Sequence, residues 1–315
     1  MIWRRKSAEP EFKLSVIVVA YNMRREVPRT LFSLTTEFQR CIDPGDYEVI
    51  VVENGSSDAL SAEEVEAFGP NFRYHYIADA SPSPANAINV GAAMARGRHL
   101  GIMIDGARIV SPGMLGQALG LLEQFDRAFV GTISFHLGPK SQTESVTEGY
   151  TQQVEDGLLE GIGWRTNGYR LFEISALAST CQSAGAGPIG ESNMVFLSKD
   201  LFDEMAGFDE RFDIPGGGMV NLDFYKRGCD LPGSQLFTIF GEGTFHQMHG
   251  GVMSNRPQAE GPSEVEKYRR QYREIRGEDF AISGRTPLMI SYPIREFRPG
   301  ILHASRTLAA RTPKR

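Results

Sequence analysis

The chain has 315 residues, with 33 Lys and Arg against 39 Asp and Glu, so its formal net charge is −6. Its hydrophobic share of 41% and charged share of 23% are those of an ordinary globular protein and exclude a disordered chain. A net acidic chain lacks the basic face of a general nucleic-acid binder, so no nucleic-acid partner is expected. Three widely spaced cysteines, Cys41, Cys181 and Cys229, argue against a disulfide framework and fit a reducing cytosol.

The chain shows no apolar run near the roughly 18–20 residues of a membrane span. Residues 1–6 lead into polar sequence, not into the apolar stretch of a secretory signal. We therefore expect a cytoplasmic protein.

Strands and helices are predicted to alternate through the first half of the chain. Residues 14–20 (LSVIVVA) form a nearly continuous apolar run rich in β-branched residues, which is typical of a parallel strand covered on both faces. The predicted strands are 14–20, 47–52, 72–77, 99–104 and 128–135. Helices are predicted at 27–38, at 85–96 before Gly97, and after an N-terminal Ser111-Pro112 cap, with a short helix capped by Ser61 and Glu64.

This order predicts a doubly wound parallel sheet, in which ligands bind at the carboxyl ends of the strands. Polar groups follow four of the predicted strands, at Tyr21-Asn22, Glu53-Asn54-Gly55, Asp79 and Asp105. Neither G-x-G-x-x-G nor G-x-x-x-x-G-K-[ST] occurs, which argues against a dinucleotide-binding fold and a P-loop NTPase. A nucleotidyltransferase would also need a glycine-rich phosphate loop after the first strand.

Four segments in chain order carry a known pattern. They are 15–22 (SVIVVAYN) with 51–58 (VVENGSSD), Asn89-Val90-Gly91 followed by 95–97 (ARG), Ile104-Asp105, and 206–212 (AGFDERF). Together they resemble the inverting GT-A glycosyltransferases of family 2, over about residues 14–249. The resemblance implies an α/β fold of GT-A (Rossmann-like) type, a three-layer α/β/α sandwich with a mostly parallel central sheet and a C-terminal helical extension.

The resemblance also implies an order of functions along the chain. Residues 1–135 would bind a nucleotide sugar, 136–260 would bind the acceptor and carry the catalytic groups, and 261–315 would form a helical basic extension. The residues expected to hold the donor are Ala20, Tyr21, Asn22, Glu53, Asn54, Asp79, Asn89, Asp105, Arg108 and His249. Among them, Tyr21 would lie along the base, Glu53 against uracil or ribose, and Asp105 against the ribose or an ion-bound water.

The family's D-x-D motif is incomplete here, because Ala107 stands where the second acidic residue usually binds Mn²⁺ or Mg²⁺. Asp105 and His249 are the remaining candidate metal ligands, and the missing carboxylate argues against a metal. Negative charge develops on the leaving diphosphate, and a cationic side chain can stabilise it in place of an ion. Arg108 is a candidate for this role; the alternative is a solvated loop residue. His246 and His249, on a glycine-flanked loop, either contact the diphosphate or a metal, or serve only as hydrogen-bonding residues.

The acidic pair that normally supplies the catalytic base is replaced by Val220-Asn221. An inverting transferase needs a carboxylate to take the proton of the acceptor hydroxyl. Asp223 and Glu191 are the candidates, and Asp223 has the alternative role of a helix-start carboxylate. Residues 216–223 also loosely resemble a region of retaining polypeptide N-acetylgalactosaminyltransferases. Inversion is therefore favoured and retention stays open.

Three further features have two interpretations each. Gly216, Gly217 and Gly218 form either a turn or a close approach to the donor sugar. Trp164, Tyr169 and Phe172 either stack on sugars or are buried in the core, the commoner use. After a predicted helix over 264–276, the basic segment 294–315 either contacts an anionic membrane surface or is a solvated or subunit-contacting tail, which we favour.

These patterns predict a glycosyltransferase that moves a sugar from a nucleotide sugar, expected to be a UDP-sugar, to a hydroxyl of a glycan or lipid-linked acceptor in cell-surface polysaccharide synthesis. The expected location is cytoplasmic, with peripheral contact at the inner membrane and homo-oligomer formation left open. The alternative is a catalytically degenerate GT-A-like protein that binds a glycan, a nucleotide or a partner enzyme.

Overall fold

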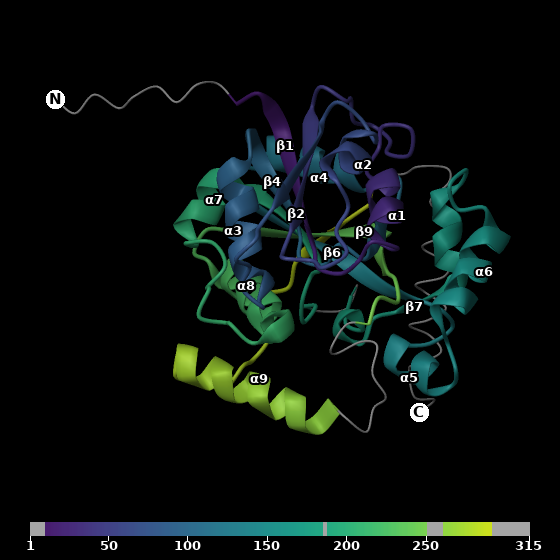
Figure 1. The fold of residues 1–315 in the computed structure, drawn as a ribbon. Coiled ribbons are helices and arrows are strands. Elements are labelled where there is room, and N and C mark those ends of the chain that lie inside the picture. Colours follow the sequence, from purple (N-terminus) through teal and green to yellow (C-terminus); the bar gives the residue numbers. More distant parts are fainter. Residues whose placement is uncertain (1–9, 185–187, 251–260, 292–315) are drawn as a thin grey trace, which may run out of the picture.

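The computed structural model describes residues 10–184, 188–250 and 261–291 (Figure 1). Within these ranges a ten-stranded mixed sheet has the order β10-β9-β6-β8-β4-β1-β2-β3, with β5 paired to β9 and β7 to β6. The strands are β1 (Phe12–Ala20), β2 (Tyr47–Glu53), β3 (Phe72–Tyr76), β4 (Gly97–Met103), β5 (Arg108–Val110), β6 (Ala128–Leu137), β7 (Ser175–Leu177), β8 (Met194–Ser198), β9 (Gln235–His246) and β10 (Leu288–Ile290).

The α-helices are α1 (Val27–Ser33), α2 (Ala62–Glu66), α3 (Pro84–Met94), α4 (Met114–Gln124), α5 (Gln142–Thr147), α6 (Gln152–Ile162), α7 (Lys199–Glu204), α8 (Val220–Asp230) and α9 (Gly261–Arg276). Three short 3₁₀ helices are η1 (Gly168–Ile174), η2 (Ser179–Cys181) and η3 (Pro215–Gly217). None of the helices in the described ranges has both the length and the apolar composition that crossing a bilayer requires.

The main path of the sheet consists of two parallel groups joined by one antiparallel strand, and the short strands β5 and β7 pair antiparallel with β9 and β6. β1 is parallel to β2 and β4, and β2 is parallel to β3. β6, β9 and β10 form the second parallel group. β8 lies between the groups and is antiparallel to both β4 and β6. The prediction of a mostly parallel sheet is confirmed.

Alternate residues of β1 bury into opposite layers, as expected for a strand covered on both faces. Ile17 and Val19 belong to a core cluster shared with α3, α7 and α8. Val16 and Val18 belong to a second cluster shared with α1, α2 and α4. This division gives the predicted three-layer α/β/α sandwich, whose layers are visible in Figure 1.

Several predicted element boundaries were wrong. α1 ends at Ser33, not near residue 38, and α3 ends at Met94, so that Gly97 begins β4 instead of ending the helix. Ser111 does not cap α4: Gly113 is the N-cap, and the Glu242 carboxylate accepts its amide hydrogen. The side chain of Ser111 accepts instead from the backbone of Gly243 on β9.

Strand β9 is 12 residues long. β9 continues to His246, so this histidine ends a strand and does not lie on a loop. The insertion after β6 buries Trp164, Tyr169 and Phe172 in the core, which confirms the core interpretation and excludes stacking on a sugar.

The C-terminal extension contributes both a helix and an edge strand. α9 packs through Tyr272 against Phe212 and Phe280, and β10 pairs with β9. The expected boundary between residues 135 and 136 falls inside β6, because the sheet runs through both halves of the chain. The basic tail at 294–315 lies outside the described residues.

Candidate active site

One cleft lies where the parallel strands β1, β2 and β4 end. Its volume is about 1980 Å³, and its lining comes from these strand ends, from β5 and β9, from η3, and from α9. Parallel strands expose their carboxyl ends at the same sheet edge, so residues far apart in sequence meet there. The predicted site residues that line the cleft are Tyr21, Asn22, Asn54, Asp105, Arg108, Glu191 and His249.

The other predicted site residues do not line the cleft: Ala20, Glu53, Asp79, Asn89 and Asp223. The Asn89 side chain is bonded to the backbone N–H and C=O of Phe208 and to Glu210. Asn89 therefore joins α3 to the 206–212 segment and has no place in the cleft wall.

The rim of the cleft near β1 carries an exposed aromatic ring. Tyr21 is 56% exposed and lines the cleft. Its neighbour Asn22 has a φ of +51°. This conformation is held by two hydrogen bonds: the backbone N–H of Asn22 donates to Ser56 Oγ, and its side-chain Oδ1 accepts from the backbone N–H of Ser57. An ordered loop thus presents the ring of Tyr21 to solvent above the cleft.

Glu53 lies behind this rim at the end of β2. It is 2% exposed, and burial raises the pKa of its carboxyl, although a hydrogen bond from Ser56 opposes the shift. Its Oε2 atom, and Oδ1 of the adjacent Asn54, have no hydrogen-bond partner among the described residues. Buried acceptors are normally paired with a hydrogen-bond donor, and a ligand in the adjacent cleft can supply that donor.

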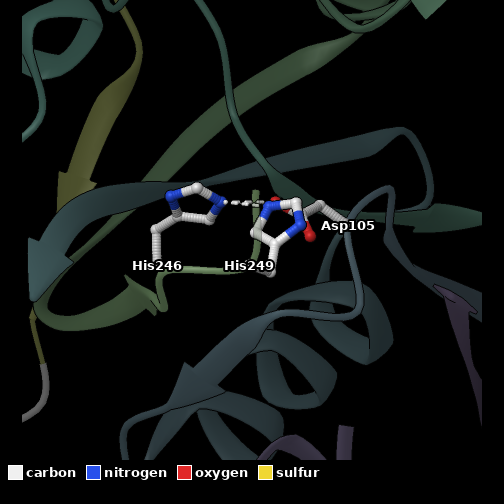
Figure 2. A group of neighbouring side chains, drawn as sticks. All are labelled: Asp105, His246 and His249. Carbon is white, nitrogen blue, oxygen red and sulfur yellow. Dashed lines mark hydrogen bonds and ion pairs between the residues drawn. The ribbon is translucent and has the colours of Figure 1, made fainter. Parts of the chain in front are cut away.

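Asp105, His246 and His249 form a compact cluster (Figure 2). His246 Nε2 lies 2.8 Å from Asp105 Oδ2 and 3.1 Å from His249 Nε2, and His249 Nε2 lies 3.7 Å from the same carboxylate oxygen. Asp105 follows β4, whereas both histidines belong to the end of β9 and the residues after it. One carboxylate and two imidazoles are a donor set that suits a divalent transition-metal ion.

The protonation states of this cluster also fit a metal site. Burial acts to raise the pKa of Asp105, but His249, His246 and Arg108 outweigh it and hold that pKa well below its usual range. Burial and the charge of Arg108 lower the pKa of His246 to about 3. An ionised carboxylate therefore faces a neutral imidazole, which is the form of histidine that binds metals.

A buried cation stands beside the cluster. Arg108, at the start of β5, lines the cleft, and its guanidinium lies 3.5 Å from Asp105 Oδ2. Burial lowers the pKa of Arg108, while Asp105 and Glu191 oppose that shift; an arginine remains charged at neutral pH. Arg108 is therefore not the solvated loop residue of the alternative interpretation.

A carboxylate held by an amide lies further along the cleft. Asn221, in the first turn of α8, donates to Glu191 Oε2 at 3.0 Å and to Asn193 Oδ1 at 3.3 Å. Asn193 in turn donates to Ser134 Oγ on β6. All four side chains line the cleft, so this hydrogen-bonded group connects its wall from α8 to the sheet.

Asp223 has a different environment. Its side chain is 1% exposed, and Arg276 of α9 and Arg227 of α8 donate to its two oxygens at 2.6–2.8 Å. The carboxylate is thus saturated by arginines and does not face the cleft. These contacts join α8 to α9 and leave no oxygen of Asp223 open to an acceptor hydroxyl.

Sequence reasoning missed several residues of the cleft. His136, Asn193, Tyr268, Arg269 and Arg273 line it, and His246 and Asn221 have larger roles than their motifs indicated. Three of them lie on α9, whose proximity to the cleft has no signal in the sequence. Gly216 and Gly218 also line it with φ values of +78° and +54°, so this segment is a turn at the cleft, and its close approach to the donor sugar stays a prediction.

The fold is the GT-A fold of glycosyltransferases. A structure of S. aureus TarS 1–349 in complex with UDP-GlcNAc has a TM-score of 0.50 and 14% identity, and the match covers 95% of this chain and 71% of that one. TarS 1–349 in complex with UDP has a TM-score of 0.47 and 14% identity, with 95% and 70% covered. At 14% identity, the match to the UDP-GlcNAc complex shows a shared fold alone.

The family of the chain follows from its sequence. The family model described as glycosyl transferase family 2 matches residues 15–179, more than half of the chain. The chain belongs to glycosyl transferase family 2. Among curated proteins, none matches it.

Proposed function

We propose that this chain transfers a sugar from a UDP-sugar to a hydroxyl of a glycan or lipid-linked acceptor, with inversion at the anomeric carbon, in cell-surface polysaccharide synthesis. One observation carries the proposal: a single cleft at the carboxyl edge of the sheet brings together an exposed ring, a cationic and metal-binding group, and a separate carboxylate. These are the groups needed to bind a base, stabilise a diphosphate and activate a hydroxyl.

The nucleotide would bind between β1 and β2. Tyr21 supplies a face on which a base can stack. Asn54 Oδ1, a buried acceptor in the cleft wall without a partner among the described residues, suits a base N–H group, and the Glu53 carboxylate lies directly behind it. TarS 1–349, which has the same fold, binds UDP-GlcNAc in its crystal structure, and this supports uridine as the base.

Asp105, His246 and His249 are the residues that would hold a divalent ion such as Mn²⁺ or Mg²⁺. Such an ion, when bound, supplies a Lewis acid for the leaving diphosphate. Asp105 and the two imidazoles provide three ligand atoms within 4.8 Å of one another. They would hold an ion even though Ala107 replaces the second acidic residue of the motif. Arg108 adds a fixed positive charge at the same place, and charge-assisted hydrogen bonds from a buried guanidinium stabilise phosphate oxygens.

Glu191 is the proposed general base. It lines the cleft, and its carboxylate accepts an amide hydrogen bond from Asn221 instead of pairing with arginines as Asp223 does. The base would thus have moved from the start of α8 to the segment before β8, and Asn221 would orient it. Glu191 would remove the proton of the acceptor hydroxyl as the hydroxyl oxygen attacks the anomeric carbon. The attack comes from the face opposite the diphosphate, which leaves as UDP.

The test is sugar transfer by the purified chain from UDP-, GDP- and dTDP-sugars to a panel of acceptors, with nucleotide release as the measurement. We expect release from a UDP-sugar, and Glu191→Gln to lower kcat by about 10²–10⁴-fold, as for a lost general base. UDP affinity should be unchanged in this variant. Glu204→Gln, an exposed glutamate on α7 paired with Arg127, is the matched control and should keep full turnover.

Two outcomes would contradict the proposal. Near-normal turnover of Glu191→Gln would remove this residue from the role of base. Tight UDP binding without release from any donor would favour the alternative, a binding protein of the GT-A fold, because Ala107 and Asn221 replace two acidic residues that the family normally uses.

A further inference from the structure

We infer that Gln142 is a positioning residue that sets the tautomer of His246 and so presents its Nε2 lone pair to a divalent cation. The inference rests on the proposed metal site and assigns a role to a buried residue outside it. Gln142 is the first residue of α5 and has no exposed surface. Both ends of its side-chain amide are bonded to His246, and the side chain also hydrogen-bonds His136 of β6. The contacts with His246 are those that can act on a bound cation.

The orientation of the Gln142 amide follows from its two contacts with His246. Its Nε2 lies 2.9 Å from the backbone carbonyl oxygen of His246, which can only accept, so this atom must be the amide nitrogen. Its Oε1 then lies 2.5 Å from His246 Nδ1. Exchanging the two amide atoms would place an oxygen against the carbonyl oxygen, which burial makes costly.

The amide orientation determines which nitrogen of His246 carries the proton. Because Gln142 Oε1 can only accept, Nδ1 must donate, and in the neutral ring Nε2 then has a lone pair. That lone pair lies 2.8 Å from Asp105 Oδ2, also an acceptor. Two acceptors at this separation repel one another unless a cation or a proton lies between them. The Nδ1–H tautomer, unlike the Nε2–H tautomer, therefore presents a lone pair that can share a cation with Asp105 and with His249 Nε2, which lies 3.1 Å away.

The position of Gln142 is itself well defined. Ser141 caps α5, because its hydroxyl accepts from the backbone of Glu144, and the Glu144 carboxylate accepts from the Ser141 amide. Gln142 therefore enters the buried side of the first helical turn. Partners that fix the second nitrogen of a metal-binding histidine typically change metal affinity by about 10–100-fold when they are removed.

The experiment measures Mn²⁺ binding by calorimetry in the full chain without donor, so that its result is independent of sugar transfer. We expect Gln142→Leu to weaken binding by about 10–100-fold. Gln142→Glu keeps an acceptor for Nδ1–H but loses the hydrogen bond to the His246 carbonyl oxygen, so it should weaken binding less than Gln142→Leu does. His246→Ala should abolish tight binding. Gln124→Leu, an exposed glutamine at the end of α4, is the matched control and should change nothing.

A second measurement reports the tautomer directly. Nitrogen-15 spectra of the histidine rings, recorded without metal, should show His246 with the proton on Nδ1, and Gln142→Leu should introduce the Nε2–H form. Thermal unfolding without metal checks that each variant is folded.

Two results would overturn the inference, and they differ. If His246→Ala abolishes binding while Gln142→Leu binds Mn²⁺ as tightly as the unsubstituted chain and keeps Nδ1–H, the role of Gln142 is wrong and the metal site stands. If the unsubstituted chain binds no divalent ion, the metal site and the inference both fail. Sugar transfer without a metal, with Arg108 as the cation at the diphosphate, is then tested separately by the nucleotide-release assay.

Discussion

The carboxylates at positions 191 and 223 show how environment, not residue type, decides a role. Both lie near the start of α8, but Asp223 is surrounded by two arginines, whereas Glu191 accepts from the neutral amide of Asn221. Both oxygens of Asp223 accept from arginine donors, so neither is available to an acceptor hydroxyl. A carboxylate in a cleft with one amide partner keeps an oxygen available for an acceptor hydroxyl.

At the residue scale, Tyr21 gives a test of nucleotide binding. We expect Tyr21→Ala to weaken UDP binding by about 1–3 kcal/mol, the range for removal of an aromatic ring that stacks on a base. Tyr21→Phe keeps the ring and should bind as tightly as the unsubstituted chain, so it serves as the control. Calorimetry with UDP measures both. Equal affinity for the Ala variant and the unsubstituted chain would show that the base lies elsewhere.

At the element scale, polar contacts as well as ring packing join α9 to the rest of the molecule. Arg276 pairs with Asp223 of α8 and with Asp209, and Gln271 donates to Asp213. These contacts hold the helix at the cleft, where Tyr268 and Arg269 form part of the lining. Asp223 thus contributes to the site by positioning an element, not by chemistry.

The Asp223–Arg276 contact can be measured as a coupling. We expect Asp223→Asn to lower the free energy of unfolding by about 1.5–3 kcal/mol, because it removes charge-assisted hydrogen bonds from a buried carboxylate. Urea unfolding of both single variants and the double variant Asp223→Asn/Arg276→Gln should give a coupling of about 0.5–3 kcal/mol. Lys267→Gln, which removes the exposed pair with Glu264 on the same helix, should have almost no effect. A coupling near zero would mean that α9 does not depend on this pair.

At the scale of the whole molecule, buried polar groups as well as strands tie the sheet to the helices around it. Glu242 on β9 accepts from Gly113 at the start of α4, from Gln117 in that helix and from the Tyr169 hydroxyl in η1. These contacts connect the sheet to two separate helices. Burial raises the pKa of Glu242 to about 7, against opposing hydrogen bonds from Ser111, Tyr169 and Gly113.

This raised pKa predicts how stability depends on pH. The folded-state pKa of about 7 exceeds the ordinary value of 4.5, so the folded protein favours the protonated carboxyl. Glu242 therefore lowers stability progressively as pH rises from about 4.5 to 7, by at most about 3 kcal/mol. Glu242→Gln should gain stability relative to the unsubstituted chain over this window, since Gln117 Oε1, which has no partner among the described residues, can accept from the new amide.

Urea unfolding at intervals from pH 5 to 8 measures this difference. A difference between Glu242→Gln and the unsubstituted chain that stays constant with pH would show that Glu242 ionises normally in the folded state.

The local patterns of the sequence were sufficient to predict the central parallel strands and the residues at one edge of the site. The apolar runs at 14–20 and 47–52 predicted the central parallel strands, and the polar residues after them line or adjoin the cleft as expected. This succeeded because the period of burial and the end of a parallel strand are properties of neighbouring residues, which the sequence displays directly. Four strands were missed: β5, β7 and β10, of three residues each, and β8, of five. So few residues carry little or no period.

Only the tertiary structure decided which carboxylate faces the cleft and which histidines meet Asp105. Residues 105 and 246 are joined because β9 continues to the same edge as β4, and Asp223 is withdrawn because α9 brings Arg276 from 53 residues away. The helical spacing of Asp223 and Arg227 is visible in the sequence, but a partner on another element is not. The chemistry of a side chain therefore follows from its own residue type, whereas its availability depends on long-range packing that no local pattern encodes.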